Sequence, residues 1–185
     1  MQMKDYASAV VLELTRTMQT ISDEELTDLT AKIISAQKVF VAGAGRSGLM
    51  AKAFAMRLMH LGIHAYVVGE SVTPQFSEGD LLIVGSGSGE TKSLVAMAEK
   101  AKSLRGSVAL VTTASTSSIG RLSDVVIHIH AQAKQETGDG STTIQPMGSL
   151  FEQSLLILYD SLVLGLMEQR NETTQTMFAR HANLE

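Results

Sequence analysis

The stretch GDLLIVGSGSGETKSL, residues 79–94, decides the fold. It begins with an unbroken aliphatic run, which passes directly into alternating glycine and serine before an acid and a threonine. Aliphatic runs without polar alternation are typical of strands that are covered on both faces. Residues 80–85 are therefore predicted to form a buried strand, and residues 91–104 to form the helix that follows the glycine-rich turn.

The same pattern of buried strand and helix continues on both sides of this stretch. Strands are expected at 38–43, 64–70, 107–112 and 124–130, with a helix at 49–62 and a short turn-rich or helical piece at 115–123. Strands that alternate with helices in this way favour a parallel sheet with helices on both faces. The sequence thus predicts an α/β fold.

Before and after this core the chain adds only helices and one loop. Helices are expected at 4–18, 22–36, 149–168 and between 171 and the C-terminus. Ser22 and Glu25 form a capping-box pattern at the start of the second of these helices. The polar connection 131–149 has the length of loops that are functional or partly disordered. No linker or repeat interrupts the chain, so we expect one domain spanning residues 1–185.

Composition excludes several classes of protein. The 185 residues include 44% hydrophobic residues and no cysteine, and carry a formal net charge of −4 without any run of lysine or arginine. Nucleic-acid binding is therefore not expected, and disulfides and thiolate metal sites are excluded. The N-terminus lacks the apolar core of a signal peptide, and the most apolar segment, 155–167, is interrupted by Asp160 and is too short to span a bilayer. We expect a soluble, cytoplasmic protein without membrane contact.

Two glycine-rich turns follow predicted strands and point to an anion site. The first is GAGRSG, residues 43–48, and the second is GSGSGET, residues 85–91. In an open parallel sheet, ligands bind beyond the carboxyl ends of the strands, where backbone N–H groups and helix dipoles attract anions. A single such turn is more simply explained as a tight turn with a capped helix. Two turns on adjacent strand ends favour a phosphate monoester.

The sequence distinguishes between classes of phosphate ligand. A nucleoside triphosphate loop needs a lysine after its last glycine, but Leu49 and Glu90 stand there. A dinucleotide site stays open, because residues 43–48 match G-x-G-x-x-G and Glu70 follows at about the distance of a ribose-binding acid. That alternative leaves the second turn unexplained, whereas a phosphosugar uses both turns.

Five segments resemble the sugar isomerase (SIS) domain family. They are VAGAGRSGLMAKAFAMRLMHLG (41–62), VVGESVTP (67–74), GDLLIVGSGSGETKSL (79–94), PMGSLFEQS (146–154) and RHANLE (180–185). The resemblance covers essentially the whole chain. It implies a five-stranded parallel sheet in a flavodoxin-like three-layer sandwich, a phosphosugar ligand, and isomerisation without metal or cofactor. It also implies assembly into a homo-oligomer, specifically a tetramer.

The resemblance also assigns roles to residues. The reaction implied moves the carbonyl of a ketose phosphate from C3 to C2 through an enediol, which needs a base for the carbon-bound proton. Glu152 matches the position of that base, and His181 matches a histidine that assists at the sugar oxygens, often from a neighbouring subunit. Without the resemblance, Glu152 would be read as a helix-dipole acid and His181 as part of a frayed tail. The two glycine-rich turns themselves predict the substrate-binding residues, which are Arg46, Ser47, Ser86, Gly87, Ser88, Gly89, Glu90 and Thr91. For Arg46, a surface salt bridge is an equally good explanation.

Other histidines and the methionines have simpler explanations. His60 lies on a methionine-rich helix and is read as a packed or interface residue, although it could reach a neighbour's site. His128 and His130 share one side of a strand, but no third ligand accompanies them, so no metal is expected. The almost wholly apolar helix that carries Met56 must be covered on more than one side, which also favours an oligomer.

Three alternatives to a ketose isomerase remain. The chain could isomerise a different sugar phosphate, sense a phosphosugar without catalysis, or bind a dinucleotide as an oxidoreductase. A sensing module would normally be attached to a DNA-binding or catalytic domain, for which the chain has no room.

Overall fold

The computed structural model describes residues 2–131 and 143–184. Its elements are α1 (Met3–Met18), α2 (Asp23–Ser35), β1 (Val39–Gly43), α3 (Arg46–His60), β2 (Ala65–Val67), β3 (Leu81–Gly85), α4 (Lys92–Ser103), β4 (Ser107–Thr112), α5 (Ser118–Leu122), β5 (Val125–His128), α6 (Ser149–Gln169) and α7 (Thr174–Phe178). Most of the connection expected at 131–149 lies outside the described residues.

The five strands form one parallel sheet in the order β2-β1-β3-β4-β5. This confirms the predicted five-stranded α/β architecture. The strand order reverses between β1 and β3, which pair in register from Val39 with Leu81 to Gly43 with Gly85. Such a reversal opens a crevice at the carboxyl ends of the two strands, where ligands of doubly wound proteins bind.

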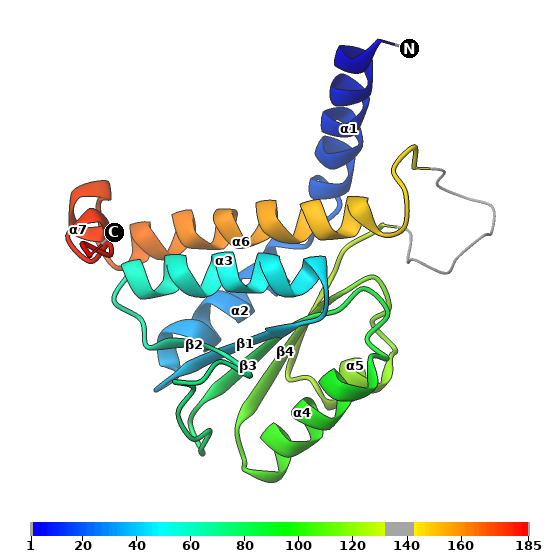
Figure 1. Cartoon of the computed structure of the whole chain (residues 1–185). Coiled ribbons are helices and arrows are strands. Elements are labelled where there is room, and N and C mark those ends of the chain that lie inside the picture. Colours follow the sequence, from blue (N-terminus) through cyan, green and yellow to red (C-terminus); the bar gives the residue numbers. More distant parts are fainter. Residues whose placement is uncertain (1, 132–142, 185) are drawn as a thin grey trace.

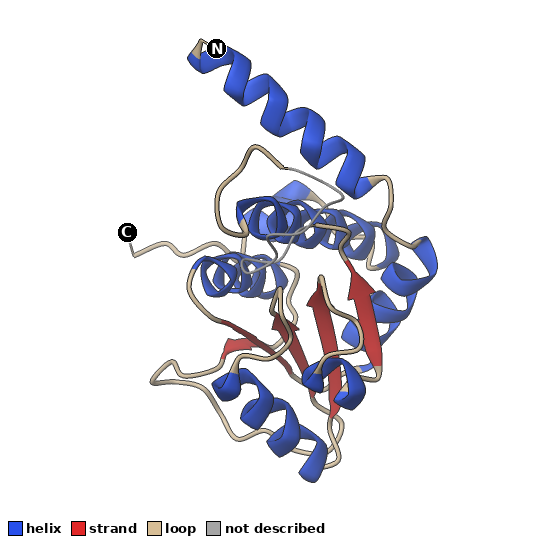
Figure 2. Cartoon of the chain, turned by 90° about the vertical axis from the view of Figure 1, so that its right-hand side faces the viewer, coloured by secondary structure: helices blue, strands red, loops and turns tan. Residues whose placement is uncertain are grey.

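Helices cover both faces of the sheet, as the aliphatic runs predict. Figures 1 and 2 show α3 and α6 side by side over one face and α4 with α5 on the other. Successive residues of β1 point to opposite sides: Val39 and Val41 pack beneath α3 and α6, whereas Phe40 and Ala42 pack against α4. Burial on both faces explains why these strands are aliphatic throughout.

Several boundaries differ from the sequence-based expectation. Helix α3 begins at Arg46 instead of Leu49, so Arg46 and Ser47 belong to its first turn and not to a loop. Strand β2 spans three residues at the edge of the sheet, where it pairs with β1. The capping box at α2 is half formed: Ser22 accepts a hydrogen bond from the Glu25 backbone, but the Glu25 carboxylate accepts one from the His128 backbone.

Helix α6 is longer than the apolar segment 155–167, which was expected to be too short to span a bilayer. It runs for 21 residues with a mean hydropathy of 1.5 over its most apolar window, which is long and apolar enough to cross a membrane. The helix is longer than the apolar segment because polar residues at both its ends are also helical. However, 56% of that window is buried inside the protein. Leu155, Tyr159 and Leu162 pack in the core, so α6 is the central helix of a globular fold.

Helix α1 projects from the body of the molecule (Figures 1 and 2). Among its residues, all of which the structure describes, only Thr17 is buried. Val11 and Leu12 are exposed by half or more of their surface. Val11 also lines a shallow apolar groove together with Leu14 and, from α6, Ile157. An amphipathic helix with an uncovered apolar side is typical of a surface that another chain covers.

Candidate active site at the carboxyl edge of the sheet

The two glycine-rich turns lie next to each other, because they leave the sheet from the paired residues Gly43 and Gly85. The first turn depends on close backbone contact. A Cβ atom on Gly48 would lie 2.7 Å from the Gly43 carbonyl oxygen, and one on Gly43 would lie 2.9 Å from the Gly48 nitrogen. Glycine at both positions lets the first turn of α3 rest directly on the end of β1.

The second glycine-rich turn is anchored to the end of β4 through the carbonyl of Gly87. The Gly87 carbonyl accepts three hydrogen bonds, at 3.0 Å from the Thr113 backbone and at 2.9 and 2.8 Å from the hydroxyls of Thr112 and Thr113. Gly89 has a φ of +61°, and a Cβ atom there would lie 2.0 Å from the Ser117 hydroxyl. Only glycine fits at this position.

An ion pair between Arg46 and Glu152 joins the N-terminal turn of α6 to the start of α3, at the carboxyl edge of the sheet. The Glu152 side chain is 3% exposed, and its Oε2 lies 2.9 Å from a guanidinium nitrogen of Arg46. Arg46 also donates a hydrogen bond of 2.8 Å to the Ser149 hydroxyl. The Arg46 side chain is 51% exposed, so it lies between solvent and the buried acid. A buried carboxylate beside a half-exposed cation is an arrangement suited to proton transfer and oxyanion stabilisation.

The second turn contacts the same helix start. A Cβ atom on Gly87 would lie 3.4 Å from the Phe151 ring, the residue before Glu152. Arg46, from the glycine-rich turn after β1, and Gly87, from the glycine-rich turn after β3, therefore both adjoin the N-terminal turn of α6. The structure brings together the two turns and the candidate base, although they are far apart in sequence.

The four predicted substrate-binding hydroxyls differ in their contacts. The Ser86 and Ser88 hydroxyls accept hydrogen bonds of 3.2 Å from the backbones of Gly89 and Glu90, so both support the turn itself. Ser47 is buried in the first turn of α3. Thr91 precedes α4 but its side chain does not cap that helix.

Glu90 has a structural contact that the sequence did not indicate. Its Oε1 accepts a 2.7 Å hydrogen bond from the Ser118 backbone at the start of α5. The hydrogen bonds from Ser118 lower the pKa of Glu90 from its ordinary value. In this conformation the carboxylate caps a helix, as acids near helix N-termini commonly do. A role in substrate binding remains a prediction.

His181 lies far from this edge within its own chain. It follows α7, and its ring stacks on that of His60 with a centroid distance of 5.3 Å. His60 ends α3, whereas Arg46 begins it, and a helix of this length spans about 21 Å at 1.5 Å per residue. A histidine at this position cannot reach Glu152 of the same chain without a large rearrangement.

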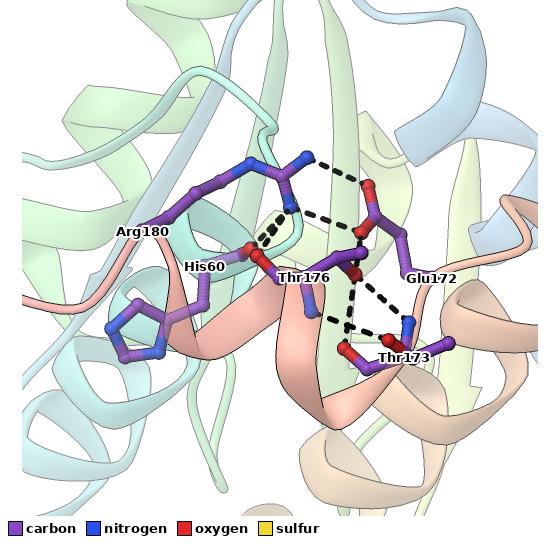
Figure 3. Close-up of polar contacts among 5 residues, drawn as sticks. All are labelled: His60, Glu172, Thr173, Thr176 and Arg180. Carbon is purple, nitrogen blue, oxygen red and sulfur yellow. Dashed lines mark hydrogen bonds and ion pairs between the residues drawn. The ribbon is translucent and has the colours of Figure 1, made fainter.

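Arg180 fixes the C-terminal segment at that distant end. Figure 3 shows its guanidinium between the His60 carbonyl, at 2.9 Å, and the Glu172 carboxylate, at 3.0 Å. This contact lowers the pKa of Glu172 and raises that of Arg180. Sequence reasoning did not single out Arg180 or Glu172. The eight-residue spacing of opposite charges around a short helix could have suggested their pairing.

His60 borders a groove of about 410 Å³ at this end of the molecule. Arg57, Asp160 and His181 line the same groove, together with apolar side chains of α6 and α7. Burial lowers the pKa of His60, and the nearby charges of Arg57 and His181 lower it further. The neutral imidazole is therefore favoured.

Two other predicted features can be placed. The rings of His128 and His130 meet edge to face, and Nε2 of His128 lies 3.0 Å from the Thr113 carbonyl. Across residues 2–131 and 143–184 there is no cluster of three or more histidine, cysteine or acidic residues that could hold a metal ion. Glu70, the candidate ribose-binding acid, forms an ion pair with Lys52.

Comparisons with known proteins identify relatives of this chain. The SIS domain family matches residues 32–158. The 3-hexulose-6-phosphate isomerase of Bacillus subtilis is 52% identical over 185 residues, covering all of both chains. The enzyme of the same name from Mycobacterium gastri is 40% identical over 94% of this chain and 86% of its own.

A solved structure is also similar over its whole length. It is a Methanococcus jannaschii protein for which a molecular function of 3-hexulose-6-phosphate isomerase was inferred. It is 34% identical, covers 98% of both chains and superposes with a TM-score of 0.82. Together with the sheet order and the two glycine-rich turns, these similarities show that the chain belongs to the SIS domain family.

Proposed function

We propose that the chain is a ketose isomerase that interconverts D-arabino-3-hexulose 6-phosphate and fructose 6-phosphate. The observation that carries this proposal is the buried Glu152 carboxylate, which lies beside Arg46 where two glycine-rich turns meet. The full-length similarity to 3-hexulose-6-phosphate isomerases supports the choice of sugar. The reaction would be the second step of formaldehyde fixation by the ribulose monophosphate route.

The site suits each part of this reaction. The two turns offer backbone N–H groups and the N-termini of α3 and α4 to the phosphate group of the sugar. The Glu152 carboxylate removes the proton at C2 of the 3-hexulose, and the resulting carboxylic acid returns a proton to C3 of the enediol. Arg46 stabilises the negative charge that develops on the sugar oxygens. Hydroxyl protons move from O2 to O3 through a second group, for which we propose His181 of a neighbouring copy.

A direct assay tests this proposal. The enzyme is expected to form fructose 6-phosphate from 3-hexulose 6-phosphate without added metal or nucleotide, as measured with a coupled assay. In deuterated water, deuterium should appear at C3 of the product, because an acid–base group exchanges its proton with solvent. Turnover of arabinose 5-phosphate instead would indicate a different sugar isomerase. Phosphosugar binding without turnover would indicate a sensing module, and enhanced NADH fluorescence a dinucleotide site.

Arg46→Lys should lower kcat/KM about tenfold to a hundredfold, because lysine keeps the charge but cannot reproduce bonds to two oxygens at once. The change is measured with the same coupled assay. Lys52→Arg, at an exposed ion pair on the same helix, serves as the matched control and should leave activity unaltered. Equal kcat/KM in the Arg46 variant and the wild type would exclude a role for the guanidinium at the reacting oxygens.

We further propose that the protein assembles into a homotetramer. Support comes from apolar side chains that a single copy leaves open to solvent: Val11 and Leu12 on α1, Met56 on α3, and Leu164 on α6. Assembly would also resolve the position of His181, which lies too far from Glu152 of its own chain. The groove that His60 and His181 border would then face a neighbour's site.

Leu164→Glu tests this assembly. Leu164 is 67% exposed and lines the groove beside His60 and His181. Replacing an apolar side chain by a carboxylate in a buried interface should weaken association by at least about tenfold and lower activity at the same time. Analytical ultracentrifugation of the variant is compared with that of Val72→Glu, because Val72 is 84% exposed in the turn that follows β2. A tetramer of undiminished stability would show that α6 does not form the interface.

The domain organisation and the cellular location are also proposals. We propose that residues 1–185 act as one domain and that the protein works in the cytoplasm. The lack of cysteine and the burial of α6 within the fold support this assignment.

A further inference from the structure

Glu13 on α1 binds three consecutive residues that precede α6. Its carboxylate accepts hydrogen bonds from the Thr143 hydroxyl at 2.6 Å, the Ile144 backbone at 2.8 Å and the Gln145 side-chain amide at 2.9 Å. We call this set of contacts the Glu13 clasp. It joins a helix near the N-terminus to a segment about 130 residues later.

The surroundings of Glu13 favour its ionised form. Burial alone would raise the pKa of Glu13, but the hydrogen bonds from Thr143, Gln145 and Ile144, with the nearby charge of Arg16, lower it below its ordinary value. The ionised form is therefore the one held. Charge-assisted hydrogen bonds of this kind are about twice as strong as neutral ones.

A strained turn separates the clasp from the candidate base. Gln145 is buried, and the Pro146 carbonyl accepts hydrogen bonds from the backbones of Gly148 and Ser149. Met147 has a φ of +60°, a left-handed conformation that is uncommon for residues with a side chain. Such a conformation persists only where the surroundings hold it. The clasp holds one side of the turn, and the bond from Arg46 to Ser149 holds the other.

We propose that Glu13 is a positioning residue that, through Gln145 and this turn, fixes the first turn of α6 and with it the Glu152 carboxylate. The inference rests on the proposed function, because Glu152 is taken as the base. Glu13 does not touch the substrate. It acts on the geometry of a distant group, where a displacement of about 1 Å can cost a hundredfold in rate.

Glu13→Ala and Thr143→Val test the proposal from both sides of the clasp. Glu13→Ala should lower kcat about tenfold to a hundredfold. KM should change less than about threefold, because the glycine-rich turns that we assign to the phosphate are intact. Amide hydrogen exchange at Gly148 and Ser149 should accelerate about tenfold or more, since these bonds close the turn. Thr143→Val, which removes one donor, should cause smaller changes in the same direction.

Glu99→Ala is the matched control, because Glu99 is an exposed acid on α4 away from the clasp. It should alter neither kcat nor exchange. Unchanged exchange at Gly148 and Ser149 in Glu13→Ala overturns the proposal. So does faster exchange with kcat within twofold of wild type, or a rise in exchange over the whole protein, which would indicate a merely structural role. Should Glu13→Ala fail to fold, Glu13→Gln and Thr143→Val are judged by the same criteria.

The exchange measurement needs no substrate, so failure of the two proposals can be told apart. A wild type that does not convert 3-hexulose 6-phosphate contradicts the isomerase assignment. Local exchange that still responds to Glu13→Ala would then leave the clasp in place. An active wild type with unresponsive exchange contradicts the positioning role alone.

Discussion

Glu152→Gln is expected to lower kcat about a thousandfold, the range of effects that loss of a general base produces. Glutamine has the same shape as glutamate, so it fills the buried position without leaving a cavity. It cannot accept the C2 proton, because its amide is not basic. Since the partner Arg46 is half exposed, it can turn to solvent, and the fold should survive the loss of the ion pair.

The measurement is the coupled assay for fructose 6-phosphate, with circular dichroism to confirm folding. Glu168→Gln is the matched control, because it makes the same chemical change on an exposed residue of the same helix. Its kcat should equal that of the wild type. Substantial turnover by Glu152→Gln would remove this residue from the reaction.

Gly48→Ala should destabilise the protein by about 2 kcal/mol or more, as overpacking of a tight contact does. The new Cβ atom would lie 2.7 Å from the Gly43 carbonyl oxygen, which is backbone and cannot move aside as a side chain could. Helix α3 would have to shift away from β1, and Arg46 and Ser47 would shift with it. Activity should therefore fall together with stability. Urea denaturation and the isomerase assay measure the two effects.

Gly165→Ala provides a control of opposite sign. Gly165 is also inside a helix, but a Cβ atom there would have nothing within 4 Å. Alanine in place of glycine inside a helix stabilises by about 0.5–1 kcal/mol. A pair of variants with equal stability would show that close packing at Gly48 does not limit the fold.

The sheet and its two turns could be predicted because their signals are local. Aliphatic runs such as residues 81–84 and the glycine pattern of residues 43–48 carry the information within a few positions. The parallel arrangement then places both turns at one edge. The position of Glu152 near that edge followed from the family resemblance and agrees with its burial.

Contacts between distant elements could not be predicted. The use of Glu90 as a cap for α5 and the clasp between Glu13 and Thr143 depend on which helix ends meet in three dimensions. Residues such as Arg46 were assigned to a loop because no N-cap side chain marks the start of α3, where Gly45 occupies that position. The separation of His181 from Glu152 follows from the length of α3, which the sequence predicted without indicating where the C-terminal segment docks.

The triple hydrogen bond at the Gly87 carbonyl has a consequence for ligand affinity. A loop that is ordered before its ligand arrives loses little conformational entropy on association, so more of the interaction energy appears as affinity. Sugar phosphates are small and offer few atoms for contact. Pre-organisation of this loop would allow such a compact metabolite to be retained with only a handful of bonds.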